Sequence, residues 1–188
     1  MRLISGGLAA LSLAIVLGRP VAAQDASPSK YFAHVGFNRA LSSSVRNALS
    51  DTGVAAGAGL VLRNGLVRTE GSQSSVEIDF LRNSANGDRL DTAGLAYTVR
   101  IPTGAGNDDT KPYYGLGLGW YRSEAKATSQ GTSGSPTTIT EKATNFGAKF
   151  LVGANVGGKA FAEASYILSG KVAGEKTDSV NFTVGLRF

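Results

Sequence analysis

Val180-Asn-Phe-Thr-Val-Gly-Leu-Arg-Phe188 closes the chain, and this stretch decides its fold. Its five apolar residues alternate strictly with Asn, Thr, Gly and Arg. A period of two is typical of a β-strand with one apolar face. In a water-soluble sheet a terminal Phe would be exposed by fraying. We therefore expect the apolar face of this strand to meet lipid.

The same alternation recurs in seven earlier segments, which predicts eight strands in all. The apolar positions of these segments lie within residues 31–37, 54–62, 76–80, 93–101, 114–120, 146–154 and 162–168. No apolar run in this part of the chain is long enough to span a membrane as a helix. Strands can lie in hydrocarbon only when the sheet closes on itself. We therefore predict an all-β protein, an eight-stranded antiparallel up-and-down transmembrane β-barrel.

The opposite face of these strands separates a membrane barrel from a water-soluble one. A soluble barrel would carry bulky charged side chains there, facing water. In this chain that face is rich in glycine, for example Gly57, Gly94, Gly117 and Gly153. Glycine weakens a solvated strand but leaves room inside a narrow barrel for a few long side chains. The pattern favours apolar side chains outside and polar ones inside.

Aromatic residues provide an independent test of this interpretation. Membrane barrels carry aromatic girdles where lipid meets water, whereas a mere preference of aromatics for strands predicts no banding. In the expected register Tyr97 and Phe150 lie nearer mid-depth. The expected interface aromatics are Tyr31, Phe37, Tyr114, Trp120, Phe146, Tyr166 and Phe182.

The chain resembles the small bacterial outer-membrane β-barrel family, in the manner of OmpX, the membrane domain of OmpA and the broader porin-like group. Residues 112–120 (Pro-Tyr-Tyr-Gly-Leu-Gly-Leu-Gly-Trp) and residues 161–166 look like strands of that family. The resemblance implies that Val184, Leu186 and Phe188 form the C-terminal signal read by the outer-membrane barrel assembly machinery. It also implies a monomer surrounded by outer-membrane lipid. No peptidoglycan-binding domain follows the barrel, so a cell-wall tether like that of full-length OmpA is not expected.

Residues 1–23 have the features of a secretory signal peptide. Arg2 is followed by an apolar run of about 15 residues and by the small residues Val21-Ala22-Ala23. A spanning helix would need about 20 residues. We therefore expect residues 24–188 to form one mature barrel domain.

Composition excludes several classes of protein. Removing Arg2 and Arg19 from the 19 basic residues leaves 17 against 14 acidic ones, a charge of +3 that is too small to indicate nucleic-acid binding. The chain has no Cys, so disulfides and a lipoprotein anchor are excluded.

Seven ionisable residues are expected on the inner face, as a luminal charge cluster. They are Arg63, Glu77, Asp79, Arg100, Lys149, Glu163 and Arg187. Buried charges need partners, and the expected register puts Glu77 between Arg63 and Arg100, and Glu163 between Lys149 and Arg187. We favour a structural plug, because eight strands enclose no open water column. The alternative is a gate or polar conduit.

Connections after odd-numbered strands are expected to be outer loops, at residues 38–53, 83–91, 122–144 and 169–179. The longest, residues 124–142, is rich in Ser, Thr and Gly and is expected to be mobile. Loops 38–53 and 122–144 are candidate sites for an extracellular partner. At the other end, Gly157-Gly158 predicts a tight turn.

No catalytic, cofactor-binding or metal-binding residues are predicted. The single His, His34, falls on the inner face, and no His-x-Ser pair follows it on any strand. Residues 106–109 could touch a cation, but a polar turn is the ordinary explanation. We therefore expect a non-enzymatic protein with a structural or surface-interaction role. A narrow transport pore for small or apolar solutes, resembling the OmpW group, is the alternative.

Overall fold

The computed structural model describes residues 30–63, 65–67, 71–105, 110–130 and 136–188. The predicted signal peptide and the polar turn at 106–109 lie outside the described residues. Within the described ranges, no helix combines the length and apolar character needed to cross a membrane.

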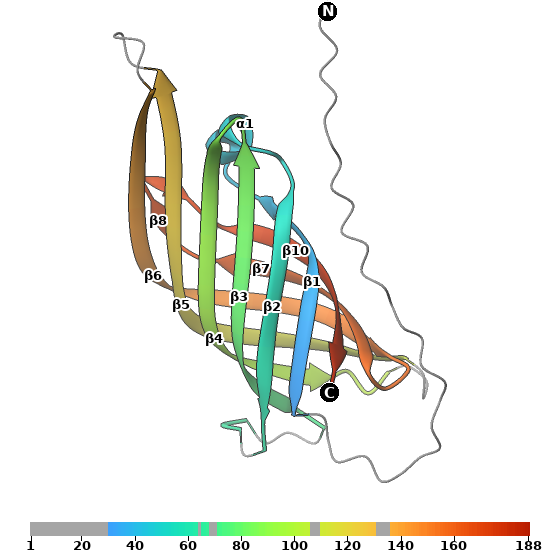
Figure 1. Cartoon of the computed structure of the whole chain (residues 1–188). Coiled ribbons are helices and arrows are strands. Elements are labelled where there is room, and N and C mark those ends of the chain that lie inside the picture. Colours follow the sequence, from blue (N-terminus) through green and yellow to red (C-terminus); the bar gives the residue numbers. More distant parts are fainter. Residues whose placement is uncertain (1–29, 64, 68–70, 106–109, 131–135) are drawn as a thin grey trace, which may run out of the picture.

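Eight antiparallel strands form one closed barrel, as predicted (Figure 1). The strands follow one another around the wall in chain order, and the last pairs with the first. They are β1 (Tyr31–Ala40), β2 (Gly53–Leu62), β3 (Gln73–Ala85), β4 (Asp88–Pro102), β5 (Thr110–Gln130), β6 (Pro136–Val156), β7 (Ala160–Leu168) and β10 (Ser179–Arg187). Closure gives each strand two neighbours, so the wall of the barrel has no free edge, whereas the upper parts of β5 and β6 pair only with each other.

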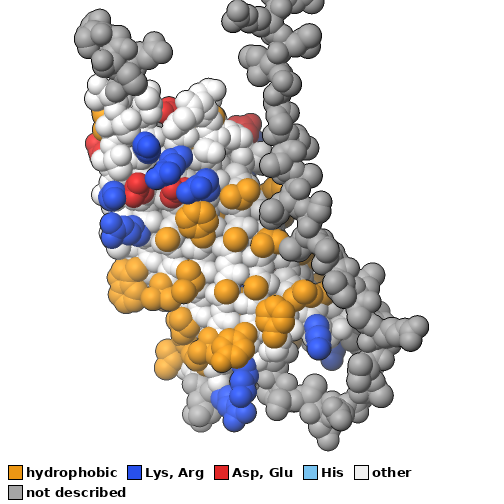
Figure 2. Space-filling view, in the orientation of Figure 1, with side chains coloured by type: hydrophobic (Ala, Val, Ile, Leu, Met, Phe, Trp, Pro, Cys, Tyr) orange, Lys and Arg blue, Asp and Glu red, His pale blue; other side chains and the backbone are white. Residues whose placement is uncertain are grey.

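The strands alternate between an outward apolar face and an inward buried face. On β10, the outward side chains of Phe182 and Val184 are 60% and 61% exposed. The side chain of Asn181, which lies next to Phe182 and points inward, is almost fully buried. On the face shown in Figure 2, apolar side chains form a broad band, with Lys, Arg, Asp and Glu above it and further Lys or Arg below it. A water-soluble barrel would show the opposite arrangement. The outward-apolar prediction is confirmed.

The expected interface aromatics and the residues of the expected assembly signal all point outward and are exposed. The aromatics are Tyr31, Phe37, Tyr114, Trp120, Phe146, Tyr166 and Phe182, and the signal residues are Val184, Leu186 and Phe188. Trp120 and Phe146 meet edge to face across β5 and β6, with ring centroids 5.6 Å apart. Such pairs stabilise neighbouring strands beyond the burial of area alone.

The end of the barrel that carries α1 (Ser43–Ala48) is called the upper end, and the other the lower end. All four segments that were expected to be upper connections contain regular structure among their described residues. Residues 38–53 include α1, and residues 169–179 include the two-stranded hairpin of β8 (Lys171–Val172) and β9 (Glu175–Lys176). Residues 83–91 are a hairpin whose turn residues Asn86 and Gly87 have φ of 52° and 90°. Asn-Gly is the pair that such a two-residue turn favours.

The prediction of a long loop at residues 122–144 was wrong. β5 runs to Gln130 and β6 begins at Pro136, so the two strands continue well above the rest of the wall. The Ser/Thr-rich composition suggested a loop, but Thr and Ile are good strand formers. Pairing between the two strands also satisfies their backbone hydrogen bonds. At the lower end the predicted tight turn at Gly157-Gly158 is present, with φ of 58° and 81°.

Whether the apolar band lies in lipid can be tested by placing a charge on it. Leu116 faces outward on β5 between Tyr114 and Trp120. We expect Leu116→Arg to weaken folding into phosphatidylcholine vesicles by about 2–4 kcal/mol, because the guanidinium would lie in hydrocarbon. Urea titration followed by the fluorescence of Trp120, the single Trp, measures this change. Thr128→Arg, on the exposed upper part of β5, is the matched control and should have little effect. Equal folding of both variants would contradict the assignment of this face to lipid.

Candidate functional site

Five charged side chains from four strands meet inside the barrel, and together they are called the ionic layer. Glu77 and Asp79 come from β3, Arg100 from β4, Lys149 from β6 and Glu163 from β7. All five are at most 5% exposed. Each occupies an inward position of its strand, so the two-residue period that exposes the apolar face also directs these charges inward.

Each base of the ionic layer contacts acids from more than one strand. Lys149 Nζ lies 3.0 Å from Glu77 Oε2, 3.2 Å from Asp79 Oδ1 and 3.8 Å from Glu163 Oε1. Arg100 Nη2 lies 2.9 Å from Glu163 Oε2, and Arg100 also pairs with Glu77. The pairs therefore link β3 and β4 to β6 and β7 across the lumen.

Uncharged and aromatic side chains complete the hydrogen bonding of the layer. Ser75 donates to Glu77 (2.6 Å), and the Tyr113 hydroxyl donates to Glu163 (3.3 Å). His34 Nε2 lies 3.2 Å from Asp79 Oδ1. Sequence reasoning placed His34 on the inner wall, which is confirmed, but it missed Ser75 and Tyr113. Both share the inward parity of the charges beside them, which was the available signal.

Two of the seven expected cluster residues lie outside the ionic layer. Arg63 is exposed beyond the end of β2, so its expected pairing with Glu77 was wrong. The register explains this, because Glu77 lies opposite Gly59 and not near the end of β2. Arg187 lies over the Phe161 ring (5.0 Å) and bonds to Asn155, so its expected pairing with Glu163 was also wrong. Arg100 takes that place instead.

Glycine lies beside every member of the ionic layer on a neighbouring strand. The pairs are Gly59 with Glu77, Gly57 and Gly94 with Asp79, Gly115 with Arg100, Gly117 with Lys149, and Gly153 with Glu163. A Cβ added at most of these positions would meet the side chains packed around the ionic layer, such as Phe32 at Gly59 and Tyr121 at Gly94. At Gly153 an added Cβ would lie 2.7 Å from the hydroxyl of Tyr113, which bonds to Glu163. The glycines therefore make room for the side chains that surround the ion pairs.

Packed layers lie above and below the ionic layer. Above it, Tyr121 is fully buried and clusters with Ala55, Leu81 and Ile167. Higher still, four hydroxyl side chains form a hydrogen-bonded series, Thr92, Ser123, Thr177 and Ser169, with neighbouring oxygens 2.9–3.4 Å apart. Below it, the rings of Phe32 and Phe161 meet edge to face at 5.9 Å.

A cavity beside His34, Asp79 and Lys149 has a volume of only about 10 Å³. A space of this size holds about one water molecule. The described part of the lumen is thus filled by side chains at the level of the ionic layer.

Charged side chains on the outer surface form a second, exposed network just above the apolar band. Arg82 Nε lies 2.6 Å from Asp91 Oδ1, and Lys142 Nζ lies 3.0 Å from Glu124 Oε2. The hydrogen bond with Asp91 raises the pKa of Arg82. The hydrogen bond from Lys142 is the main cause that lowers the pKa of Glu124. Exposed pairs of this kind contribute little to stability, but they mark where the wall becomes polar.

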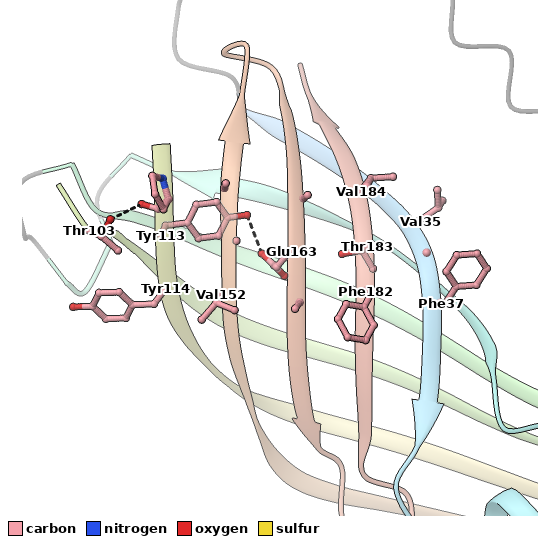
Figure 3. A pocket seen from close by; sticks show the side chains of 16 residues that line it. Val35, Phe37, Thr103, Tyr113, Tyr114, Val152, Glu163, Phe182, Thr183 and Val184 are labelled. Carbon is pink, nitrogen blue, oxygen red and sulfur yellow. Dashed lines mark hydrogen bonds between the residues drawn. The ribbon is translucent and has the colours of Figure 1, made fainter. Parts of the chain in front are cut away.

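A hollow of about 800 Å³ lies on the outer wall over β7, whose outward side chains Ala162 and Ala164 are small (Figure 3). Glu163 also lines it, but its carboxylate is buried and accepts a hydrogen bond from Tyr113. The larger outward side chains at its border are Val35, Phe37, Tyr114, Val152, Phe182 and Val184. This hollow therefore belongs to the apolar band.

Among the described residues, no three His, Asp or Glu side chains come together in a group that could hold a metal ion.

No protein-family model and no curated protein sequence matches this chain. Solved structures do resemble it. Neisserial surface protein A has a TM-score of 0.59 at 19% identity, covering 86% of this chain and 96% of that chain. Ail of Yersinia pestis has a TM-score of 0.49 at 12% sequence identity, covering 86% of this chain and 100% of that chain. The N-terminal β-barrel domain of Pseudomonas aeruginosa OprF has a TM-score of 0.47 at 13% sequence identity, covering 85% of this chain and 98% of that chain. The chain thus has the fold of the small bacterial outer-membrane β-barrels.

Proposed function

We propose that this chain is a non-enzymatic integral protein of the bacterial outer membrane whose lumen is sealed and whose upper end interacts with the exterior. The single observation that carries the proposal is the ionic layer. Its two bases, Arg100 and Lys149, each pair with acids across the barrel, and Lys149 contacts three of them. Because side chains fill the barrel at this level, we assign the function of the protein to its surface.

The apolar band supports a membrane location. Outward side chains over the middle of the wall are apolar, and the exposed ion pairs begin only above Phe80 and Trp120. This is the distribution that a bilayer requires of a membrane barrel. The upper end would then face the exterior, with α1 and the tall β5–β6 hairpin as its most prominent parts.

The surroundings of His34 support a non-enzymatic role. A general base must reach a substrate, directly or through one water. His34 is only 4% exposed, bonds to Asp79 and packs against the rings of Phe32 and Phe161. His34 therefore contributes to the packing inside the barrel wall.

The sealed lumen is tested by removing one base of the ionic layer. In Lys149→Met, Glu77, Asp79 and Glu163 would face Arg100 without their shared ammonium group. We expect stability in vesicles to fall by about 3–5 kcal/mol, because uncompensated buried charge is costly. Planar-bilayer recordings should show no steady current for the wild type and brief, irregular openings for the variant, as water enters to solvate the acids.

Lys142→Met is the matched control on the same strand. It breaks an exposed ion pair with Glu124, so the loss should be at most about 1 kcal/mol, without openings. A steady, ion-selective current through the wild-type protein would contradict the sealed lumen and favour a transport pore.

The C-terminal residue tests the proposed recognition by the barrel assembly machinery. The Phe188 side chain is 62% exposed, while its backbone bonds to Tyr31 and Lys30 at the seam between β1 and β10. Phe188→Ala keeps those backbone bonds and removes only the ring. We expect much less protein in the outer membrane of cells but nearly unchanged spontaneous folding into detergent micelles. Equal losses in both settings would assign the ring to packing and not to recognition.

A further inference from the structure

Four segments enclose a pocket at the upper end of the barrel, which is called the mouth pocket. It is formed by α1, the start of β4, the upper parts of β5 and β6, and the β8–β9 hairpin, and it has a volume of about 320 Å³. Sealed layers lie below it, so it opens toward the exterior and not into a channel.

The floor of the mouth pocket is apolar and firmly built. Val45 of α1, Leu90 of β4 and Val172 of β8 are buried against one another, and Leu49 and Ala125 pack on them. Two interactions fix α1 over this floor without a ligand: Ser42 caps the helix and donates to Glu175 Oε2 (3.1 Å).

Arg46 adds a third restraint on α1, because its guanidinium donates to the carbonyl oxygens of Ala40 (3.1 Å) and Leu41 (2.6 Å). The helix is therefore tied to the end of β1. A preformed apolar pocket of this size, with a few polar groups around it, is typical of a small-molecule site, at the lower end of the usual volume range.

The polar groups of the mouth pocket are mainly carboxylates. Asp88, Glu141 and Glu175 line it, and none of the three forms an ion pair within the described residues. Asp88 accepts a hydrogen bond from the Thr128 amide (2.7 Å), and Glu175 accepts one from Ser42. Glu141 is exposed on the side formed by β6. In the described part of the chain, the three carboxylates thus lie beside an apolar floor without a paired base.

Two bases, Arg89 and Lys126, also line the mouth pocket. Arg89 lies 3.3 Å from Asp91 and 3.5 Å from Glu124 on the outer surface, so its charge is compensated there. Lys126 lies between Ala125 and Ala127, and strand alternation directs its side chain to the face opposite theirs. The mouth pocket therefore presents an excess of negative charge.

We propose that the mouth pocket binds a small organic cation, a molecule with an apolar body and an amine or quaternary ammonium group. The body would cover Val45, Leu90 and Ala125, and the cation would lie near Glu141 and Glu175. This inference rests on the proposed function in one respect, because the upper end must face the exterior for the pocket to receive a ligand from outside. It names the chemical class of partner that the loops at residues 38–53 and the β5–β6 hairpin would hold.

The binding test uses the full-length mature barrel in phosphatidylcholine nanodiscs, with empty nanodiscs as a blank for partitioning into lipid. Hexyltrimethylammonium is the probe, and 1-hexanol and heptanoate are neutral and anionic compounds of similar apolar length. Calorimetric titration should give saturable binding of the cation and at least about tenfold weaker binding of the other two. Equal affinity for all three compounds, or no saturable binding of the cation, overturns the inference.

Two variants locate the site. Glu141→Gln removes an exposed charge without touching the floor, so the protein should fold normally and bind the cation roughly two- to fivefold more weakly. Glu124→Gln is the matched control, because Glu124 lies on the opposite face of the same hairpin and pairs with Lys142 and Arg89. Arg89 keeps its contact with Asp91 in this variant, so cation affinity should not change. An equal loss in both variants would mean a general charge effect and would also overturn the inference.

The same preparation separates this inference from the proposed function. Bilayer recordings report whether the lumen is sealed, whereas the titration reports only the mouth pocket. A conducting barrel that binds the cation would refute the sealed lumen and keep the pocket. A sealed barrel without cation binding would refute the pocket alone.

Discussion

Every inward side chain of an eight-stranded barrel shares a space little wider than the side chains themselves. A charge placed there cannot keep its hydration shell and must find its counter-charge across the lumen. Lys149 and Arg100 meet this requirement by contacting acids that come from other strands. The network links opposite walls, so the ion pairs constrain the arrangement of the whole barrel.

The same constraint explains the unusual glycine content of the inner face. The register places a glycine on one neighbouring strand beside each of the five charged residues, and this leaves room for the side chains that pack around them. The bulky ring of Tyr121 shows the same rule, because it occupies the space left by Gly94 and Gly147. Large side chains lie beside glycines around the interior, so the lumen is filled without forcing the strands apart.

Local features were therefore predictable from the sequence, whereas cross-lumen partners were not. The two-residue period is visible in any single strand, so the outward positions of Phe182 or Trp120 and the inward position of Glu77 follow directly. The partner of Glu77 depends on the stagger of strands around a closed wall, a global property. This is why Glu77 was expected to pair with Arg63, whereas its contact with Lys149, three strands away around the wall, was not expected. The upper end was hardest to predict, because a Ser/Thr-rich segment suits both a loop and a long hairpin.

The two ends of the barrel consequently differ in what they can do. At the lower end β6 and β7 are joined by the tight turn at Gly157-Gly158, and the rings of Phe32 and Phe161 lie beneath the ions. At the upper end β5 and β6 extend beyond their neighbours, and α1 with the β8–β9 hairpin packs over a separate apolar floor. The sealed interior isolates this floor from the lumen, so specificity for an outside molecule can vary there without disturbing the ion pairs that hold the barrel. Under the proposed function, a filled barrel would serve as a rigid base for binding groups at its mouth.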